Sequence, residues 1–330
     1  MRSLVTGGAG FIGSHVAERL LAAGHFVVVL DDLSGGSLAN LPEGVEFEEG
    51  SILDVTKVDQ LFEKYKFDYV YHLAAYAAEN LSHFIKKFNY ENNLIGSVNL
   101  INASVNTNVK HFVFTSSAAV YGHSDTGCKE IEYPTPCDSY GISKLAVEEE
   151  LRVSHEMFGL NYTIFRPHNV YGPRQNVGDK YRNVVGIFMN CLRQDKPMTI
   201  FGDGGQTRCF SYIDDVAPYI VKSPVIEAAR NEIFNIGHPY STTITGLAAM
   251  VASVMGKTCI VTHLTGRAEA SEVAVSHGKF KQVFQPSDSL ALKPGLEAMF
   301  DWLKSAEVRE SPLMPVEITK NLPESWRVAK

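Results

Sequence analysis

The chain has 330 residues, of which 45% are hydrophobic and 20% charged, and its formal net charge at pH 7 is −7. This composition is that of a globular protein with one large or two modest domains, and an acidic balance without a basic block gives no support for nucleic acid or an anionic membrane as a partner. The first apolar strand is expected almost at Met1, which leaves no room for a signal peptide, and no apolar run reaches membrane-spanning length.

Short β-branched runs alternate with amphipathic segments in the first half of the chain. Strands are expected at "SLVT" (3–6), "FVVVL" (26–30), "YVYHLA" (69–74), "HFVFTSS" (111–117) and "YTIFR" (162–166), and helices at 14–24, 58–65, 92–105 and 143–151. Apolar strands followed by helices describe βαβ units and a parallel sheet covered on both faces. The predicted fold class is therefore α/β, with a doubly wound parallel sheet of the Rossmann type.

The pattern loosens after Pro167 into a stretch rich in Gly, Asn and Pro. A helix is expected at 184–192, a strand at 233–237 and a helix at 246–256, whereas 311–330 has three prolines and no clear periodicity. We predict a first domain over 1–166 with a return segment at about 210–237. A smaller mixed α/β domain is expected from 167–209 and 238–330.

The stretch "LVTGGAGFIGSH" places Gly7, Gly10 and Gly13 between the first strand and the first helix. Glycines there allow a tight turn and a close approach of the backbone to a pyrophosphate, and the helix N-terminus presents N–H groups to the phosphates. Asp31 ends the next strand, 18 residues past Gly13. An acid there accepts both ribose hydroxyls and repels a 2′-phosphate, so the pattern predicts NAD rather than NADP. The alternative is a purely structural glycine turn.

Tyr140 and Lys144 lie four positions apart in "SYGISKLAVEEEL", which we expect to form the first turns of a helix. Such a pair can be a surface contact worth a few tenths of a kcal/mol, or a phenol tuned for acid–base chemistry. Ser117 ends a strand 23 residues upstream of Tyr140, at the sheet edge where ligands bind. Because all three follow the glycine turn in this order, we favour the catalytic interpretation.

The motifs "TGGAGFIGSH", "HLAA", "SSAAVYG", "YGISK", "FRPHNVYGPRQ" and "GDGGQTRCFSYIDD" extend this pattern along the chain. From residue 2 to at least Lys279 the sequence resembles the extended short-chain dehydrogenase/reductases of the nucleotide-sugar epimerase and dehydratase family. The resemblance implies that Tyr140 accepts a proton, that Lys144 lowers its pKa and binds the nicotinamide ribose, and that Ser117 bonds the sugar oxygen being oxidised. A nearby ammonium and a cationic nicotinamide both favour phenolate.

The resemblance also implies two sets of binding residues. Around NAD it implies Gly7, Gly10, Phe11, Ile12, Gly13, Asp31, Asp32, Leu33, Ser51, Ile52, Leu73, Ala74, Ala75, Asn93, Tyr140, Lys144 and His168. Around a UDP-sugar it implies Ser117, Tyr140, Asn169, Asn183, Val184, Thr199, Phe201, Arg208 and Arg267. Arg208 matches the family's diphosphate-binding arginine, a role that suits its bidentate fork. Three positions depart from the family pattern: Ser51 and Asp32, where aspartate and asparagine are common, and Arg267 in its spacing.

The residues after Ser117 bear on the reaction. Relatives that eliminate water carry Asp-Glu there, and decarboxylases carry Glu, whereas Ala118 and Ala119 can be neither acid nor base. The resemblance then implies 4-epimerisation of a UDP-hexose, first UDP-glucose and UDP-galactose, through a transient 4-keto intermediate. Alternatives are the epimerisation of UDP-glucuronate or a UDP-N-acetylhexosamine, and a non-catalytic NAD-binding regulator, which the retained Ser117, Tyr140 and Lys144 disfavour.

Five scattered cysteines without metal-ligand spacing predict reduced thiols, a cytoplasmic protein and no metal site. The family resemblance further implies a homodimer, through a four-helix contact made by 93–105 and 143–158. Leu145, Val147, Leu151 and Val153 cover more of the second helix than one packed face requires, which favours this contact.

Overall fold

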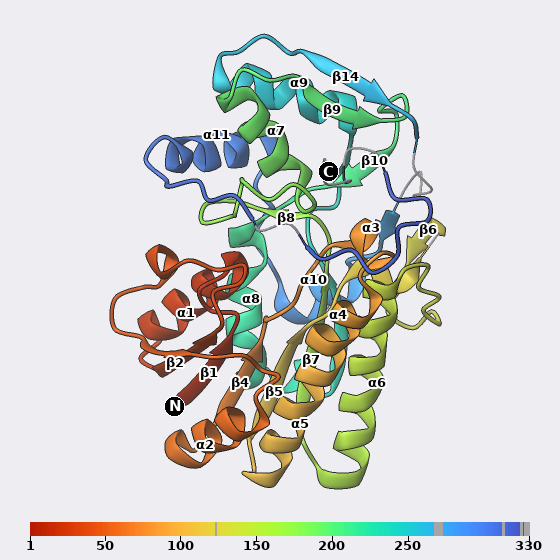
Figure 1. The fold of residues 1–330 in the computed structure, drawn as a ribbon. Coiled ribbons are helices and arrows are strands. Elements are labelled where there is room, and N and C mark those ends of the chain that lie inside the picture. Colours follow the sequence, from red (N-terminus) through yellow and green to blue (C-terminus); the bar gives the residue numbers. More distant parts are fainter. Residues whose placement is uncertain (123, 267–272, 312–313, 324–325, 327–330) are drawn as a thin grey trace.

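The centre of the computed structural model, which describes residues 1–122, 124–266, 273–311, 314–323 and 326, is a seven-stranded sheet. All its neighbouring strands pair in parallel, in the order β12-β7-β5-β4-β1-β2-β3 (Figure 1). The strands are β1 (Arg2–Thr6), β2 (Phe26–Asp31), β3 (Glu46–Glu49), β4 (Tyr69–His72), β5 (His111–Thr115), β7 (Tyr162–Pro167) and β12 (Glu232–Ile236). This is the Rossmann-type α/β architecture that the sequence predicts.

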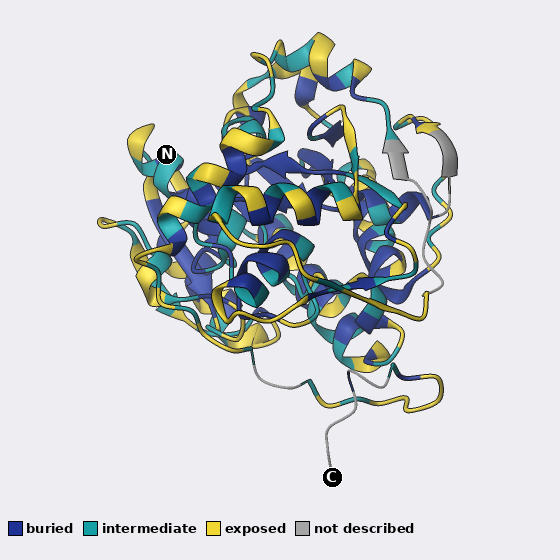
Figure 2. Cartoon of the chain, turned by 90° about the horizontal axis from the view of Figure 1, so that it is seen from above, coloured by how far each residue is buried: buried dark blue, intermediate teal, exposed yellow. Residues whose placement is uncertain are grey.

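Successive side chains of each strand enter the hydrophobic layers on opposite faces of the sheet. Leu4 lies in the layer on one face and Val5 in the layer on the other, as the period of two requires. Helices α1 (Phe11–Ala22) and α8 (Ala217–Lys222) cover the face of Val5. Helices α2 (Val55–Tyr65), α5 (Gly96–Asn106) and α6 (Ser139–Phe158) cover the face of Leu4. Both faces are therefore buried, and Figure 2 shows the exposed residues on the outer sides of the helices.

A second group of elements stands above the sheet in Figure 1. It contains helices α7 (Val184–Arg193), α9 (Ile244–Met255) and α11 (Leu292–Leu303), with the strand pairs β9 (Met198–Phe201) with β14 (Val261–Leu264), and β10 (Thr207–Cys209) with β13 (Ser241–Thr243). The hydrophobic layer of Val5 continues into this group through Phe188, Leu247 and Met299. The two groups therefore share one continuous core.

Short elements connect these layers. They are α3 (Glu79–Ser82), α4 (Lys86–Tyr90), the π-helical turn η2 (Glu91–Ile95), α10 (Gly278–Phe284), the pairs β8 (Val170–Tyr171) with β11 (Ser211–Tyr212) and β6 (Ser124–Cys128) with β15 (Val273–Val275), and the 3-10 turns η1 (Leu38–Asn40), η3 (Ala118–Tyr121), η4 (Ile213–Asp215), η5 (Ser223–Val225) and η6 (Glu227–Ala229). Strand β12 returns to the central sheet and pairs with β7. We propose the predicted residue boundaries as those of two domains. Among the described residues, no helix combines the length and apolarity needed to cross a membrane.

The apolar cover of α6 differs from the sequence-based expectation. Val147 and Leu151 are fully buried in the chain's own core, and Leu145 packs partly on a small cluster around Val120. Among the four residues named as support for a second packed face, only Val153 is exposed. Val147 and Leu151 therefore do not support a dimer contact, because they pack within the chain's own core.

Candidate active site

The glycine turn brings the end of β1 against the end of β4. Gly7 has a φ of +71°, and a Cβ atom there would lie 2.7 Å from the backbone nitrogen of Ala74. A Cβ atom on Gly13 would lie 2.1 Å from the carbonyl oxygen of Gly7. Only glycine therefore permits this approach, and α1 begins directly after Gly10 with its N-terminus at the carboxyl edge of the sheet.

Asp31 holds the glycine turn to the end of β2. Its carboxylate accepts hydrogen bonds from the backbone nitrogens of Ala9, at 3.0 Å, and Leu33, at 2.8 Å. Burial raises the pKa of Asp31, and these backbone hydrogen bonds act against the rise. Because each carboxylate oxygen has a second lone pair, the group can still accept the two hydroxyls of a ribose.

Tyr140 and Lys144 lie in the first turns of α6, as the sequence predicts. Asp138 caps the helix by accepting from the backbone nitrogen of Gly141 at 2.7 Å. The hydroxyl of Ser82 accepts from the backbone nitrogen of Tyr140 at 3.1 Å. Lys144 is buried, donates to the carbonyl oxygen of Thr115 at 2.9 Å, and has its Nζ 5.7 Å from the centre of the Tyr140 ring.

The electrostatics of this pair oppose ionisation of either group. Burial raises the pKa of Tyr140, the charge of Glu79 raises it further, and a hydrogen bond with Ser117 lowers it. Burial lowers the pKa of Lys144 to about 7, against the opposite influence of Glu148. At the higher pH where Tyr140 would ionise, Lys144 is thus already neutral. Of the charges that act most on Tyr140, that of Arg182 is positive and lowers its pKa. That Lys144 lowers the pKa of Tyr140 stays a prediction.

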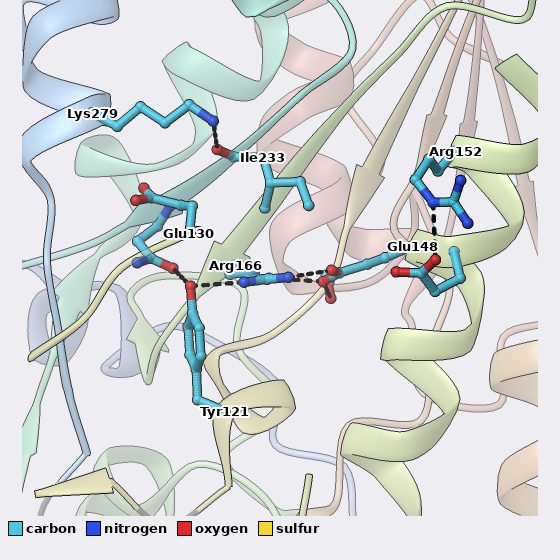
Figure 3. A network of polar contacts seen from close by, with 10 residues as sticks. Tyr121, Glu130, Glu148, Arg152, Arg166, Ile233 and Lys279 are labelled. Atoms are coloured by element: carbon cyan, nitrogen blue, oxygen red, sulfur yellow. Dashed lines mark hydrogen bonds and ion pairs between the residues drawn. The ribbon is translucent and has the colours of Figure 1, made fainter. Parts of the chain in front are cut away.

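A buried ion pair connects α6, the helix of Tyr140 and Lys144, to strand β7 (Figure 3). The Nε of Arg166, in β7, donates to Glu148 of α6 at 3.0 Å, and both side chains are 2% exposed. Ser116, next to Ser117, also donates to Glu148. Arg166 further donates to the hydroxyl of Tyr121 at 2.7 Å. The pair therefore fixes the end of β5 relative to the helix of Tyr140.

A cleft of about 980 Å³ lies between the carboxyl edge of the sheet and the second group of elements. It is lined by most of the predicted residues: Gly7, Gly10, Phe11, Ile12, Gly13, Asp31, Asp32, Ile52, Leu73, Ala74, Ala75, Ser117, Tyr140, Lys144, His168, Asn169, Asn183, Val184, Thr199, Phe201 and Arg208. The structure thus brings together the proposed cofactor and substrate residues in one cleft. Its volume lies at the upper end of the range for ligand sites.

Three predicted cofactor residues, Leu33, Ser51 and Asn93, do not line the cleft in the described part of the chain. Asn93 is buried, and its amide bonds both the backbone nitrogen and the backbone oxygen of Tyr76. It therefore supports the loop after β4 from behind. Ser51 accepts from the backbone nitrogen of Leu53, while Arg267 lies outside the described residues.

His168 lines the cleft, but both ring nitrogens face protein groups. Its Nδ1 lies 3.3 Å from the carbonyl oxygen of Cys209, and its Nε2 lies 3.0 Å from Nε2 of His277. Burial lowers the pKa of His168 to about 4 and that of His277 to about 3. Any contact of His168 with a cofactor would thus use its ring or backbone.

Several cleft residues carry no predicted role. They are Glu79 and His83 near α3, Gln175 and Arg182 in the loop before α7, and Trp326 near the C-terminus. Gln175 could have been identified from the sequence because it lies in the motif "FRPHNVYGPRQ". The other four residues reach the cleft only through tertiary packing. Arg182 is held by Asp179 at 2.6 Å and lies over the ring of Tyr76.

Gln175 tests whether the cleft suits a polar ligand. It is 2% exposed, and within the described part of the chain neither its amide nitrogen nor its amide oxygen has a hydrogen-bond partner. The same holds for Oγ1 of Thr115, which also lines the cleft. Buried polar atoms without partners are costly, so these atoms fit a ligand rich in hydroxyls and phosphates. Together with the glycine turn and Asp31, they fit a dinucleotide. In the described residues no group of three or more His, Cys, Asp or Glu side chains could hold a metal ion.

Comparisons with known proteins agree with this geometry. The model of the NAD dependent epimerase/dehydratase family matches residues 3–237. The UDP-glucose 4-epimerase of Mycolicibacterium smegmatis is 36% identical over 263 residues, which cover 78% of this chain and 83% of that protein.

Two solved structures have similar folds. UDP-glucose 4-epimerase of Thermotoga maritima with UDP-glucose is 34% identical, with a TM-score of 0.88 and coverage of 92% of this chain and 99% of that one. UDP-glucuronic acid 4-epimerase of Bacillus cereus, in complex with UDP-glucuronic acid and NAD, is 32% identical, with a TM-score of 0.82 and coverage of 92% and 99%.

Proposed function

Because the chain belongs to the NAD-dependent epimerase/dehydratase family and is therefore an NAD-binding enzyme of the nucleotide-sugar epimerase/dehydratase class, we propose that it catalyses 4-epimerisation of a UDP-hexose. UDP-glucose and UDP-galactose are the proposed pair of substrates. The observation that carries this proposal is the composition of one cleft wall. Ser117, Tyr140 and Lys144 line it, and the two residues that follow Ser117 are the chemically inert Ala118 and Ala119.

Tyr140 takes the central role in the proposed reaction. Its phenolate oxygen accepts the proton of the sugar's 4-hydroxyl group, and the resulting phenol later returns a proton to the oxygen of the other epimer. Ser117 holds that sugar oxygen by a hydrogen bond. Lys144 binds the nicotinamide ribose. NAD, when bound, supplies a hydride acceptor and a positive charge, and it is regenerated in every cycle. Between the two half-reactions the transient 4-keto sugar rotates, so that the hydride returns to its other face. No net oxidation of the sugar occurs.

The nucleotide ends of the ligands are assigned to opposite parts of the cleft. The glycine turn, with Asp31, Asp32 and Ile52, is proposed to hold NAD, and Arg208 of β10 the diphosphate of the substrate. A uracil would lie between Thr199 and Phe201 of β9, with Asn183 and Val184 at the start of α7 and Asn169 at the end of β7. Arg267 stays a proposed second diphosphate ligand. A cytoplasmic location also stays a proposal, based on the scattered cysteines.

The first alternative substrate is UDP-glucuronate, the ligand of the similar Bacillus cereus enzyme. Glu79 and Arg182 act on Tyr140 with opposite charges, so the charges near Tyr140 do not rank the sugars. A UDP-N-acetylhexosamine is the second alternative, and a regulator without catalysis is the third.

The deciding experiment is a panel of UDP-sugars incubated with the purified protein and followed by NMR. We expect UDP-glucose and UDP-galactose to interconvert, with 4-epimers as sole products and unchanged substrate mass. Faster turnover of UDP-glucuronate or an N-acetylhexosamine would replace the proposed substrate. Loss of water would reassign the reaction to elimination, with Glu79 and His83 as the acid–base candidates. Binding without turnover of any sugar would favour the regulator.

A further inference from the structure

The C-terminal segment, defined here as residues 314–323 together with Trp326, packs on the helices beside the cleft. Leu322 and Trp326 are buried in one hydrophobic cluster with Ala78, Leu81 and Ile85, which belong to α3 and its flanks. This cluster is separate from the two large cores of the molecule. The sequence of the segment has no helical or strand pattern, but the segment packs at a defined position on these helices.

Polar contacts hold the C-terminal segment at the same position. The carboxylate of Glu317 accepts from the backbone nitrogens of Lys87, at 2.8 Å, and Phe88, at 2.9 Å, in the first turn of α4. The backbone nitrogens of Glu317 and Ile318 both donate to the carbonyl oxygen of Phe84. Glu317 thus satisfies donors that the start of a helix leaves unpaired.

The helices under this segment hold the start of α6. Ser82, the last residue of α3, accepts from the backbone nitrogen of Tyr140, and Asn89 of α4 donates to the carbonyl oxygen of Ser139 at 2.8 Å. A chain of direct contacts therefore runs from Glu317 through α3 and α4 to the proposed proton acceptor. The segment is part of the support of the reacting end of the cleft.

Trp326 itself lines the cleft. Its ring meets Phe84 edge-on, with centroids 6.1 Å apart, and Tyr181 edge-on at 5.4 Å. Phe84 follows α3, whereas Tyr181 belongs to the loop before α7 and also lines the cleft, so the indole contacts two separate segments of the chain. Glu79, whose charge acts on Tyr140, also belongs to α3. The indole and Tyr140 therefore both line the cleft and both contact α3 or its flanks.

We propose that the C-terminal segment forms a wall of the sugar subsite and that Trp326 determines which substituents the sugar can carry. The inference rests on the proposed function and deepens it. A rigid indole held between Phe84 and Tyr181 limits the space beside the sugar ring. The class of substrate it favours is a UDP-hexose without a bulky substituent.

The chain offers a spectroscopic test because it has only two tryptophans, Trp302 and Trp326. Trp302 lies in α11 and is not among the described residues that line the cleft. In the NAD-bound Trp302→Phe variant, the tryptophan emission therefore comes from Trp326 alone. We expect saturating UDP-glucose to change this emission and saturating UDP to leave it unchanged, while calorimetry shows that both bind.

The outcomes separate this inference from the proposed function. If UDP-glucose binds but the emission of Trp326 stays the same, the indole is not in the sugar subsite and the inference is overturned. An equal change with UDP and UDP-glucose would move Trp326 to the nucleotide end, which also overturns it. If no UDP-sugar binds, the proposed function fails, and the inference fails with it.

A kinetic test follows the same logic. Trp326→Ala should raise kcat/KM for UDP-N-acetylglucosamine relative to that for UDP-glucose by about tenfold, a change within the range that a pocket contact controls. Trp326→Phe, which keeps an aromatic wall, should preserve most of the original preference. Trp302→Phe is the matched control and should leave the ratio unchanged. An unchanged ratio in Trp326→Ala that still retains NAD would contradict the inference. If Trp326→Ala fails to fold, Trp326→Phe and the emission measurement decide.

Discussion

In the proposed reaction Tyr140 acts as a phenolate, although its surroundings oppose the loss of its proton. Burial raises its pKa, and the adjacent Lys144, whose own pKa burial lowers to about 7, is neutral before the phenol ionises. Burial therefore favours the neutral phenol at this position. In the proposed reaction the positive charge of the oxidised nicotinamide favours the phenolate, so proton transfer and oxidation are coupled.

Tyr140→Phe keeps the ring and its packing but removes the proton acceptor. We expect kcat to fall by at least about a hundredfold, at the low end for loss of a general base, while NAD stays bound. Steady-state kinetics and the absorbance of the bound nicotinamide would measure the two quantities. Turnover near the wild-type rate would mean that the proton travels by another route.

Gln175 supports a prediction of opposite effects on stability and binding. Its buried amide has no partner in the described part of the chain, so Gln175→Leu should raise the unfolding free energy of the ligand-free protein by about 1 kcal/mol. The same change should weaken NAD or the UDP-sugar by about tenfold, the cost of one lost hydrogen bond of about 1.4 kcal/mol.

Urea unfolding and separate calorimetric titrations of NAD and UDP-glucose would test Gln175→Leu. Gln282→Leu, at an exposed position of α10, is the matched control. If both ligands bind Gln175→Leu as they bind the wild type, the amide does not face either ligand.

Three elements meet at one buried ion pair. Arg166 of β7 and Glu148 of α6 bond each other, and Ser116 joins them from the end of β5. The geometry of the candidate active site thus depends on the packing of β5, α6 and β7 rather than on any one loop. Removing one member of a buried pair leaves an uncompensated charge, which costs far more than losing an exposed pair.

Glu148→Gln should lower the unfolding free energy by about 3 kcal/mol or more, because it leaves the Arg166 charge buried without its counterion. Glu149→Gln changes the neighbouring residue, which bonds Arg152 at the surface, and should cost less than about 1 kcal/mol. Urea unfolding of the two variants is the measurement. Equal losses would show that Glu148 contributes no more than a surface charge.

Helices and strands with a regular hydrophobic pattern could be predicted from the sequence, whereas those without such a pattern could not. The strands of Val5, Val28 and Phe112 have buried, β-branched or aromatic runs that predict a parallel sheet. Strand β3, "EFEE", lies at the edge of the sheet and has three glutamates, and no strand was expected there from the sequence.

The candidate site divides in the same way. Ser117, Tyr140 and Lys144 stand at strand and helix ends that local pattern identifies. Trp326 and Glu79 reach the cleft through long-range packing of short segments, which no local pattern encodes. Asn93 stands where the family resemblance implied a cofactor contact, but its hydrogen bonds go to the backbone of Tyr76.

The whole molecule presents an apolar stripe that its own fold leaves uncovered. Ile142, Val153 and Met157 of α6 are 44%, 39% and 68% exposed, and Ile95, just before the adjacent α5, is 49% exposed. We predict a homodimer through these helices, with twice the mass of the chain by light scattering. Val153→Arg should raise the fraction of monomer, whereas Val225→Arg, at an exposed position elsewhere, should not. A monomeric wild-type protein would contradict this prediction.

Buried neutral histidines predict how stability depends on pH. Burial lowers the pKa of His72 and His277 to about 3 and that of His111 and His168 to about 4. Between pH 6.5, the ordinary value, and these values, the unfolded chain binds more protons than the folded one. Stability should therefore fall as the pH falls, by about 1.4 kcal/mol per pH unit for each such histidine.

Urea unfolding between pH 7 and pH 4.5 would measure this slope. His111→Gln keeps a hydrogen-bonding group for Thr163, which His111 contacts at 2.8 Å, but cannot titrate. Its slope should be smaller than that of the wild type by about one histidine's share. Identical slopes would mean that His111 titrates normally in the folded protein.

The return of β12 to the central sheet has a consequence for synthesis on the ribosome. Strand β7 ends at Pro167 and β12 begins at Glu232, so 64 residues separate the two neighbours. At about 5–20 residues per second, translation needs roughly 3–13 s to cover that distance. During this time the outer backbone groups of "YTIFRP" lack their partner, and a nascent chain with an open strand edge can pair with another chain. The order of translation thus gives this protein a brief period of aggregation risk that ends when β12 is made.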